Sequence, residues 1–295
     1  MSVTPARWAA LDALRAVRRG ELADRALARV LERVTPRERP WVQELVLGTL
    51  RLRGRIDWML DGLVRRGIAS LEPDVLDILR LGAYQLLEMG SVPVYAAVSQ
   101  AVEMAKRVAG KWVGGLVNGV LHSLNRERDR IAFPDAAENV VGYLATWGSH
   151  PKWLVERWVE RFGADGARAL VEANNSRPEL YIRPVRVPVD EALRRLRGAG
   201  IDAEPVPFAP DALRIAPPAG AREVLAEVPA VVQDPAAGLV VRYAAVPDGA
   251  VVADLCAAPG GKAVALAEHA RYVVAADVSY SRMERVRENA ERIGG

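Results

Sequence analysis

The residues best suited to chemistry form one short stretch, Asp254-Leu-Cys-Ala-Ala-Pro-Gly-Gly-Lys262. An apolar run typical of a β-strand precedes it and a helix-forming run follows it, which predicts a tight turn between strand and helix. Gly260 and Gly261 lack the side chains that would keep a ligand away from the backbone amides of this turn.

Asp277 lies 17 residues after Gly260, where the next predicted strand ends. A carboxylate at that place can accept hydrogen bonds from both hydroxyls of a ribose. The turn and Asp277 together predict a site for a cofactor that contains adenosine. The turn is not G-x-G-x-x-G, which disfavours NAD, and it lacks the spacing and the Lys-Ser/Thr pair of a Walker loop. Asp254 has two interpretations that the sequence does not separate: it orients the turn, or it is a structural aspartate at a strand end.

Three segments must position these residues. Residues 1–130 are expected to be helical throughout, because apolar residues recur at helical spacing, as they do in 93–109 and 111–124. Gly90 and Gly110 mark expected helix ends. No strand-like alternation interrupts this segment, so it is predicted to be an all-α domain.

The other two segments contain strands. Residues 137–230 are predicted to form a small α/β domain with a strand at 180–187, a short helix at 190–197 and a loop-rich, proline-containing stretch at 205–218. Residues 231–295 follow the order β-loop-α-β-α, with strands at 250–255 and 272–276. That order is typical of the start of a Rossmann-like, doubly wound sheet.

Positive charge is concentrated at the front of the chain. Residues 1–66 carry 14 Arg and 8 Asp or Glu, a net charge of 14 − 8 = +6, which leaves 3 − 6 = −3 for the remaining 229 residues. Neutralising phosphates with arginine drives binding to nucleic acids. The excess therefore favours an RNA-binding front, although a solvated arginine-rich helix surface would have the same composition.

The composition also excludes several classes of protein. No run of apolar residues is long enough for a membrane span, and a single cysteine, Cys256, rules out an internal disulfide, so a cytoplasmic protein is expected. Three histidines and one cysteine give no metal-ligand spacing, so no metal is expected. His150 is expected to form local hydrogen bonds rather than to act as a general base. Arg177 could contact RNA phosphate or be an ordinary loop arginine.

The turn resembles the first cofactor motif of the Nop/Sun family of RNA cytosine-5 methyltransferases. Three further stretches resemble signatures of its small-subunit ribosomal branch, the RsmB (Sun/Fmu) proteins: 149–154 (SHPKWL), 173–178 (ANNSRP) and 232–235 (VQDP). The helical front is similar to the NusB RNA-binding fold, at 41–51 and 116–121. The resemblance thus extends over essentially the whole chain.

This resemblance implies a site and a substrate. It implies that S-adenosyl-L-methionine is contacted by Cys256, Ala257, Ala258, Pro259, Gly260, Gly261, Lys262 and Asp277. It also implies that the substrate is a cytosine of 16S, small-subunit, ribosomal RNA, methylated at C5. The chain would then combine a NusB-like domain at 1–130, an α/β domain of RNA-binding type at 137–230 and the first part of a methyltransferase domain at 231–295. Oligomeric state stays open.

Methylation at C5 requires a thiolate that adds to C6 of cytosine. In the family this nucleophile comes from a later Thr-Cys motif, and a second cysteine follows a proline. Neither dipeptide occurs here, and Cys256 lies in the cofactor turn, where packing or cofactor contact is expected instead. No catalytic residue is therefore assigned, the nucleophile is expected beyond Gly295, and the chain is expected to be an inactive fragment of the enzyme. The alternative is a non-catalytic RNA-binding adapter that works through its NusB-like front.

Overall fold

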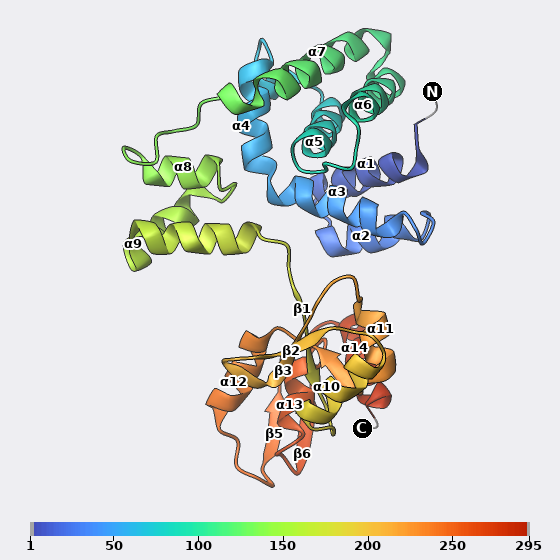
Figure 1. The fold of residues 1–295 in the computed structure, drawn as a ribbon, viewed down its shortest axis with the longest axis vertical. Coiled ribbons are helices and arrows are strands. Elements are labelled where there is room, and N and C mark those ends of the chain that lie inside the picture. The colour runs from blue at the N-terminus through green and yellow to red at the C-terminus, as the bar shows by residue number, and fades with distance from the viewer. Residues whose placement is uncertain (1–2, 294–295) are drawn as a thin grey trace. The chain divides into compact units, whose positions relative to one another are not determined.

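The computed structural model describes residues 3–293, which form two compact units (Figure 1). The first unit ends at Ser176 and is helical. The second begins at Arg177 and contains every β-strand found in the described residues. A helical front, a small antiparallel sheet with helices and a short parallel sheet follow one another along the chain, which confirms the predicted fold class.

The front of the first unit is a bundle of helices around one apolar core. Leu45, Ile56, Leu79 and Leu121 come from four different helices and are fully buried. Between α6 and α7, Gly110 has a φ of +92°, a value that L side chains rarely adopt, so the predicted helix end at this glycine is confirmed. The helices are α1 (Pro5–Arg18), α2 (Ala23–Leu31), α3 (Arg39–Arg51), α4 (Arg53–Leu63), α5 (Pro73–Leu87), α6 (Val94–Ala109) and α7 (Lys111–Glu127), with single 3-10 turns η1 (Ile68–Ser70) and η2 (Arg128–Arg130).

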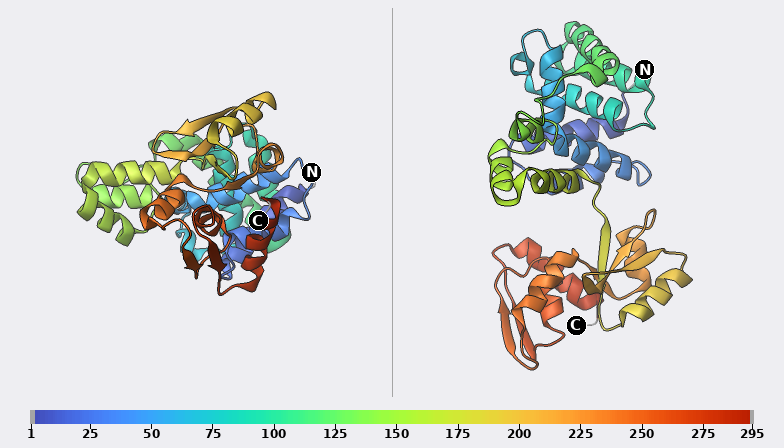
Figure 2. Two further views of the ribbon diagram at one scale, coloured as in Figure 1. Left: turned by 90° about the horizontal axis from the view of Figure 1, so that it is seen from below. Right: turned by 60° about the vertical axis from the view of Figure 1, so that its left-hand side comes forward.

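Two more helices, α8 (Val140–Thr146) and α9 (Lys152–Asn175), complete the first unit. They pack on one another (Figure 2). Leu144 and Val171 belong to their shared core, and α8 also contacts α4. Within α9, Gly163 has a non-helical φ of +72°, which kinks the helix. The division into compact units thus places α8 and α9 with the helical front. The sequence predicted instead that residues 137–230 form one α/β domain. The division into functional domains stays a prediction.

The second unit begins with a four-stranded antiparallel sheet in the order β2-β3-β1-β4. Its elements are β1 (Leu180–Pro184), α10 (Val189–Gly198), β2 (Ala203–Val206), β3 (Ala209–Ile215), α11 (Ala221–Glu227) and β4 (Ala230–Val232). The strand and the short helix expected here are present.

The prediction of a loop-rich stretch at 205–218 is wrong, because all of β3 and the second half of β2 lie in it. Pro205 lies on the edge strand β2, next to an irregularity in its pairing with β3. Pro210 lies at the start of β3, before the residues that pair with β1. An edge, an irregularity and a strand start are places where the missing N–H of proline costs no ladder hydrogen bond.

The last part of the chain begins with a helix at 235–244 that was not expected, and then has the predicted β-loop-α-β-α order. It consists of α12 (Pro235–Ala244), β5 (Val251–Asp254), α13 (Gly261–Leu266), β6 (Tyr272–Ala275) and α14 (Tyr280–Arg292). β5 and β6 pair in parallel, with Val251 opposite Tyr272 and Asp254 opposite Ala275. Val251, Tyr272 and Val274 are exposed, so one face of this two-stranded sheet presents apolar side chains to solvent in the described part of the chain.

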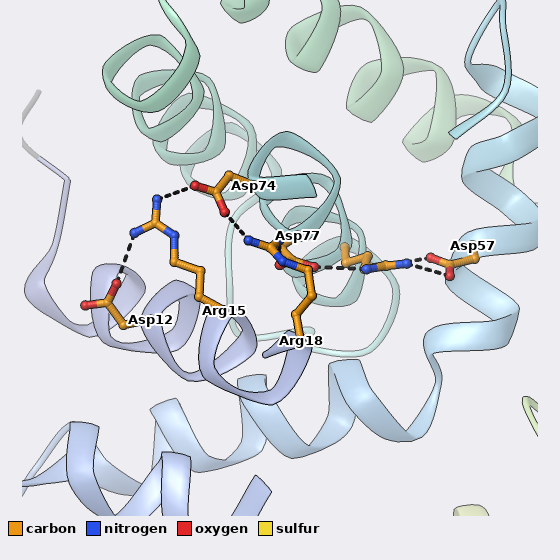
Figure 3. A network of polar contacts seen from close by, with 7 residues as sticks. Asp12, Arg15, Arg18, Asp57, Asp74 and Asp77 are labelled. Carbon is orange, nitrogen blue, oxygen red and sulfur yellow. Dashed lines mark hydrogen bonds and ion pairs between the residues drawn. The ribbon is translucent and has the colours of Figure 1, made fainter. Parts of the chain in front are cut away.

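A chain of alternating aspartates and arginines joins three helices of the first unit (Figure 3). Arg15 of α1 binds Asp12 at 3.1 Å and Asp74 at 2.7 Å, and Arg18 binds Asp74 and Asp77 at 2.5 Å each. Asp74 and Asp77 are both on α5. Arg15 and Arg18 hold the pKa of Asp74 down to about 2, the hydrogen bond from Arg15 being the larger cause, so this carboxylate stays ionised.

Arg80 of α5 extends the chain to α4. Its guanidinium binds Asp77 at 2.9 Å and both carboxylate oxygens of Asp57, at 2.7 and 2.8 Å. Asp77 is 3% exposed, and burial raises its pKa against the opposing effect of Arg18 and Arg80. A carboxylate this deep is stable only while its arginines remain, so the network fixes how α1, α4 and α5 pack.

We expect Arg80→Met to destabilise the helical unit by about 3 kcal/mol, because it leaves Asp57 and the buried Asp77 without their shared cation. Urea unfolding followed by helical circular dichroism measures the loss. Arg126→Met is the matched control: Arg126 is exposed and pairs with its neighbour Glu127, so the loss should stay below about 1 kcal/mol. Equal losses in the two variants would contradict a structural role for the network.

Candidate functional site

The predicted cofactor turn lies at the carboxyl end of β5, and Asp277 lies just beyond the end of β6. Because the two strands are parallel, both features come to the same edge of the sheet. The backbone N–H of Ala258 donates to Asp277 Oδ2 at 3.2 Å. The two parts of the site that the sequence placed 19 residues apart are therefore in direct contact.

Most of the turn's amides are already used within the protein. Cys256 N donates to Asp254 Oδ1 at 3.1 Å, Ala257 N to the carbonyl of Ala276 at 2.9 Å, and Gly260 N to the carbonyl of Ala257 at 2.7 Å. With Ala258 N on Asp277, four amides face inward. The expectation that the turn offers its amides to a ligand is wrong for these four, because a backbone donor that already has an acceptor is not free to bind another.

Asp254 orients the turn. Its Oδ1 accepts the N–H of Cys256 two residues later, which favours the first of its two interpretations. Its Oδ2 is buried and has no hydrogen-bond partner among the described residues. A buried acceptor without a partner is a candidate contact for a donor supplied by a ligand.

The two glycines serve packing within the protein. Gly260 has a φ of +108°, and a Cβ there would lie 3.3 Å from the Cα of Val286 on α14. At Gly261 a Cβ would lie 3.2 Å from Nε2 of Gln233. The prediction that a missing side chain at Gly260 leaves space for a ligand is therefore wrong, because α14 already fills that space.

The carboxylate of Asp277 holds the turn in place. Ser279 N donates to its Oδ1 at 3.0 Å, in addition to the bond from Ala258, and Arg282 lies 3.9 Å from Oδ2. The pKa of Asp277 is lowered, first by the Ser279 hydrogen bond and also by the Ala258 hydrogen bond and Arg282, against an opposing effect of desolvation. Each oxygen accepts one backbone hydrogen bond and keeps further lone pairs for a ligand.

Two side chains of helix α14 donate hydrogen bonds to backbone carbonyls of the turn. These contacts were not predicted from the sequence. Arg282 donates to the carbonyl of Ala258 at 2.7 Å, and Asn289 donates to the carbonyl of Pro259 at 2.9 Å. Both residues lie on the same face of α14 as Val286, and this spacing of four and then three residues was the available signal. Gln233, against Gly261, lies within the 232–235 stretch, but its burial was not visible in the sequence.

The side chains of the turn divide into two groups. Ala257 and Ala258 are buried, whereas Cys256, Pro259 and Lys262 are exposed. Of the two roles expected for Cys256, packing or cofactor contact, its exposure disfavours packing. Contact with a cofactor stays a prediction for all of them.

A cavity of about 940 Å³ in the second unit lies elsewhere. It is lined mainly by apolar side chains of the loop after β1 and of α13 and α14, and none of the predicted cofactor residues lines it. The buried Arg183 at its wall pairs with Asp211 and Glu268, which ties β1 to the end of α13. This cavity is separate from the edge of the sheet that carries the turn.

The signature stretches at 149–154 and 173–178 meet in the first unit. The carbonyl of Gly148 accepts hydrogen bonds from Nδ1 of His150 at 2.6 Å and from Nδ2 of Asn175 at 2.8 Å. The expected local role of His150 is therefore confirmed. Arg177 is exposed at the start of the second unit, and its suggested RNA contact stays a prediction.

With one exception, the arginines of residues 1–66 fall into two groups. Some are bound internally: Arg15, Arg18, Arg29 and Arg55 pair with carboxylates, Arg55 also donates to the carbonyl of Trp147, and Arg7 donates to the side chain of Gln85. Others are exposed and make no ion pair with any of the described residues. These are Arg19, Arg25, Arg33, Arg37, Arg39, Arg53, Arg65 and Arg66, and the half-buried Arg51 belongs to neither group. Between residues 3 and 293, no group of three His, Cys, Asp or Glu side chains is placed to hold a metal ion.

Three protein-family models match consecutive parts of the chain. The NusB family matches residues 4–126, the ferredoxin-like domain of RsmF/B-like methyltransferases matches 150–221, and the 16S rRNA methyltransferase RsmB/F family matches 243–295. The chain thus combines a NusB-like region with ferredoxin-like and methyltransferase regions of the RsmB/F type. This confirms the resemblance found in its sequence motifs.

Two individual relatives are similar to most of this chain. The ribosomal RNA small subunit methyltransferase B of Klebsiella pneumoniae is 33% identical over 288 residues, covering 94% of this chain and 64% of the relative. The protein of the same name from Citrobacter koseri is 32% identical over 284 residues with the same coverage. The chain thus spans 64% of the length of these relatives. The crystal structure of PH0851 has a TM-score of 0.71 and 21% identity, covering 100% of this chain and 68% of that one, which shows a shared fold.

We expect Gly260→Ala to loosen the turn and α14 together, because Ala at a positive φ costs about 1–2 kcal/mol and its Cβ presses on Val286. Hydrogen exchange of amides in 256–264 and in α14 should become faster. Gly115→Ala on α7 is the control, since nothing lies within 4 Å of its Cβ position. Unchanged exchange in the Gly260 variant would mean that the turn does not depend on this contact.

Proposed function

We propose that this chain holds the RNA and the methyl donor for S-adenosyl-L-methionine-dependent methylation of C5 of a cytosine in 16S ribosomal RNA, in the cytoplasm. The observation that carries the proposal is the hydrogen bond from Ala258 N to Asp277, which unites the two predicted cofactor elements at one sheet edge. The names of the relatives, which span the chain's three matched regions, support methylation of small-subunit ribosomal RNA, while the choice of cytosine C5 and of the methyl donor rests on the sequence motif.

The residues proposed to contact the methyl donor are Cys256 to Lys262 and Asp277. Asp277 is ionised, and its remaining lone pairs suit the hydroxyls of a ribose. The unpartnered Oδ2 of Asp254 suits an additional donor. When bound, the cofactor supplies an electrophilic methyl group, and the internally bonded turn positions it without having to reorganise.

Cys256 is not the proposed nucleophile. Its backbone N–H is bound to Asp254, and both neighbouring residues belong to the turn that should contact the donor. A thiol in that place is suited to touch the donor rather than to add to C6 of the base. The thiolate for catalysis is therefore proposed to lie outside these 295 residues.

RNA bearing 5-fluorocytosine at the target position tests this assignment, because a nucleophilic thiolate becomes trapped on it as a covalent adduct. We expect no adduct and no transfer of labelled methyl groups with this chain, and the same result with Cys256→Ser. An adduct that the wild-type chain forms and Cys256→Ser does not would show that Cys256 is the nucleophile.

The proposed RNA surface consists of exposed arginines that have no carboxylate partner. Arginines bound within the bundle already have their charges neutralised, so they add little to phosphate binding. The exposed set can release counterions from RNA, which makes binding weaken steeply with salt. An RNA-binding adapter without catalysis would share this property, and binding of the methyl donor distinguishes the two.

Changing Arg33, Arg37, Arg65 and Arg66 together to Gln should weaken binding to small-subunit RNA and flatten the plot of log affinity against log salt by roughly 2 units. The matched control removes the same charge from the same unit at Arg29, Arg107, Arg126 and Arg128, each of which lies within ion-pair distance of a carboxylate. Filter binding at several salt concentrations gives both slopes. Equal slopes for the two variants would place the RNA surface elsewhere.

A further inference from the structure

A small pocket of about 270 Å³ lies where α4, α8 and α9 meet in the first unit. Arg55, Tyr143, Trp147, Arg168 and Asn175 line it, together with the exposed Glu172, whose carboxylate is in ion-pair distance of neither arginine. Two arginines, two aromatic rings and an amide therefore face one hollow, next to the Gly148 carbonyl where the 149–154 and 173–178 stretches meet. Neither stretch contributes to the proposed cofactor site.

The aromatic rings provide flat apolar faces. Tyr143 and Trp147 are nearly parallel, with 6.3 Å between ring centroids and 16° between ring planes. Trp147 is 40% exposed although it contacts Phe133 and Arg55. Bases of unpaired RNA stack on such rings, because every base has a π-face and unpaired bases are free to turn outward.

The two arginines differ in how much of their charge is neutralised. Arg55 donates to the carbonyl of Trp147 at 2.6 Å and lies 3.6 Å from Glu88. Arg168 lies over the ring of Tyr143, and no carboxylate of residues 3–293 is within ion-pair distance of it. Arg168 therefore has a full, partly accessible charge at the wall of the pocket, which suits a phosphate.

The orientation of the Asn175 side-chain amide follows from its hydrogen bond. Its Nδ2 must face the Gly148 carbonyl, since a carbonyl oxygen can only accept, so the other end of the amide is an oxygen. That Oδ1 is buried and has no partner in the described chain. A buried acceptor of this kind calls for a donor such as an exocyclic amine.

We propose that this pocket binds one unpaired nucleotide of the RNA: the base lies against Tyr143 and Trp147, its amine donates to Asn175 Oδ1, and its phosphate pairs with Arg168. The proposal rests on RNA being the partner of this chain. Because Oδ1 is an acceptor, the pocket favours bases that carry an exocyclic amine, such as cytosine, over uracil.

Oligonucleotide binding to the full chain tests the pocket, with hexacytidylate, hexauridylate and 5′-CMP as probes. We expect hexacytidylate to bind roughly fivefold more tightly than hexauridylate, because only cytosine supplies the amine. Arg168→Ala should weaken hexacytidylate binding about tenfold. Arg168→Lys should recover part of that loss, because it keeps the charge but not the planar guanidinium.

Arg161→Ala is the matched control, since Arg161 is on the same helix and lies over the ring of Phe162, but does not line this pocket. It should leave hexacytidylate affinity unchanged. If Arg168→Ala lowers the melting temperature, Tyr143→Leu replaces it as the test and should cause a similar loss, because it removes a stacking surface.

Three results would contradict the proposal that this pocket binds a nucleotide of the RNA. Equal binding of hexacytidylate and hexauridylate would remove the role of Asn175, and equal effects of the Arg161 and Arg168 variants would remove that of Arg168. Binding of 5′-CMP as tight as that of hexacytidylate would indicate a site for free nucleotides. If one of these results is obtained while small-subunit RNA still binds with a steep salt dependence, only the proposal for the pocket is wrong. If the chain binds no RNA at all, the proposed function fails with it.

Discussion

The burial of Asp77 is the constraint on which the first unit depends. A carboxylate inside a helical core requires cations, and the chain supplies Arg18 from α1 and Arg80 from α5, the latter shared with Asp57 of α4. This requirement fixes the three helices against one another. It also places α4, whose Arg55 reaches the Trp147 carbonyl and whose Gly54 N–H is bound by Ser149 Oγ at 2.7 Å. The contacts between the bundle and the α8–α9 pair therefore follow from how α4 is held.

A related principle governs the turn after β5, where the groups to be satisfied belong to the backbone. Amides on one side of the turn donate to Asp254, Asp277 and neighbouring carbonyls, and carbonyls on the other side accept from Arg282 and Asn289. The turn thus has its shape before any ligand arrives. A site shaped in advance loses less entropy when it binds. The same contacts explain why glycine is needed at 260: the helix that holds the turn leaves no room for a side chain.

Arginine has two separate uses in this protein. Where it meets buried carboxylates, as in Arg18 and Arg80, its charge is neutralised and it stabilises helix packing. Where it is exposed without a carboxylate, as in Arg33, Arg66 and the less exposed Arg168, its charge remains available to an anionic partner. Net charge by sequence segment combines the two uses, so it indicated a basic front without identifying which arginines could bind RNA.

The sequence by itself determined the order and type of most elements, because helical periodicity, the glycine at 110 and the strand-turn-helix pattern around 254–262 are local signals. It also determined which residues meet at the cofactor edge, since parallel strands bring their carboxyl ends together. It misjudged 205–218, because proline is compatible with a strand when the strand is an edge, and edge position depends on pairing partners. Only the tertiary structure decided that Gly260 packs on Val286, that Arg282 and Asn289 hold the turn, and that Arg168 and Asn175 face one pocket with Arg55. Each of these contacts joins residues from different elements, and the packing of one element on another is a property of the whole chain that no local pattern encodes.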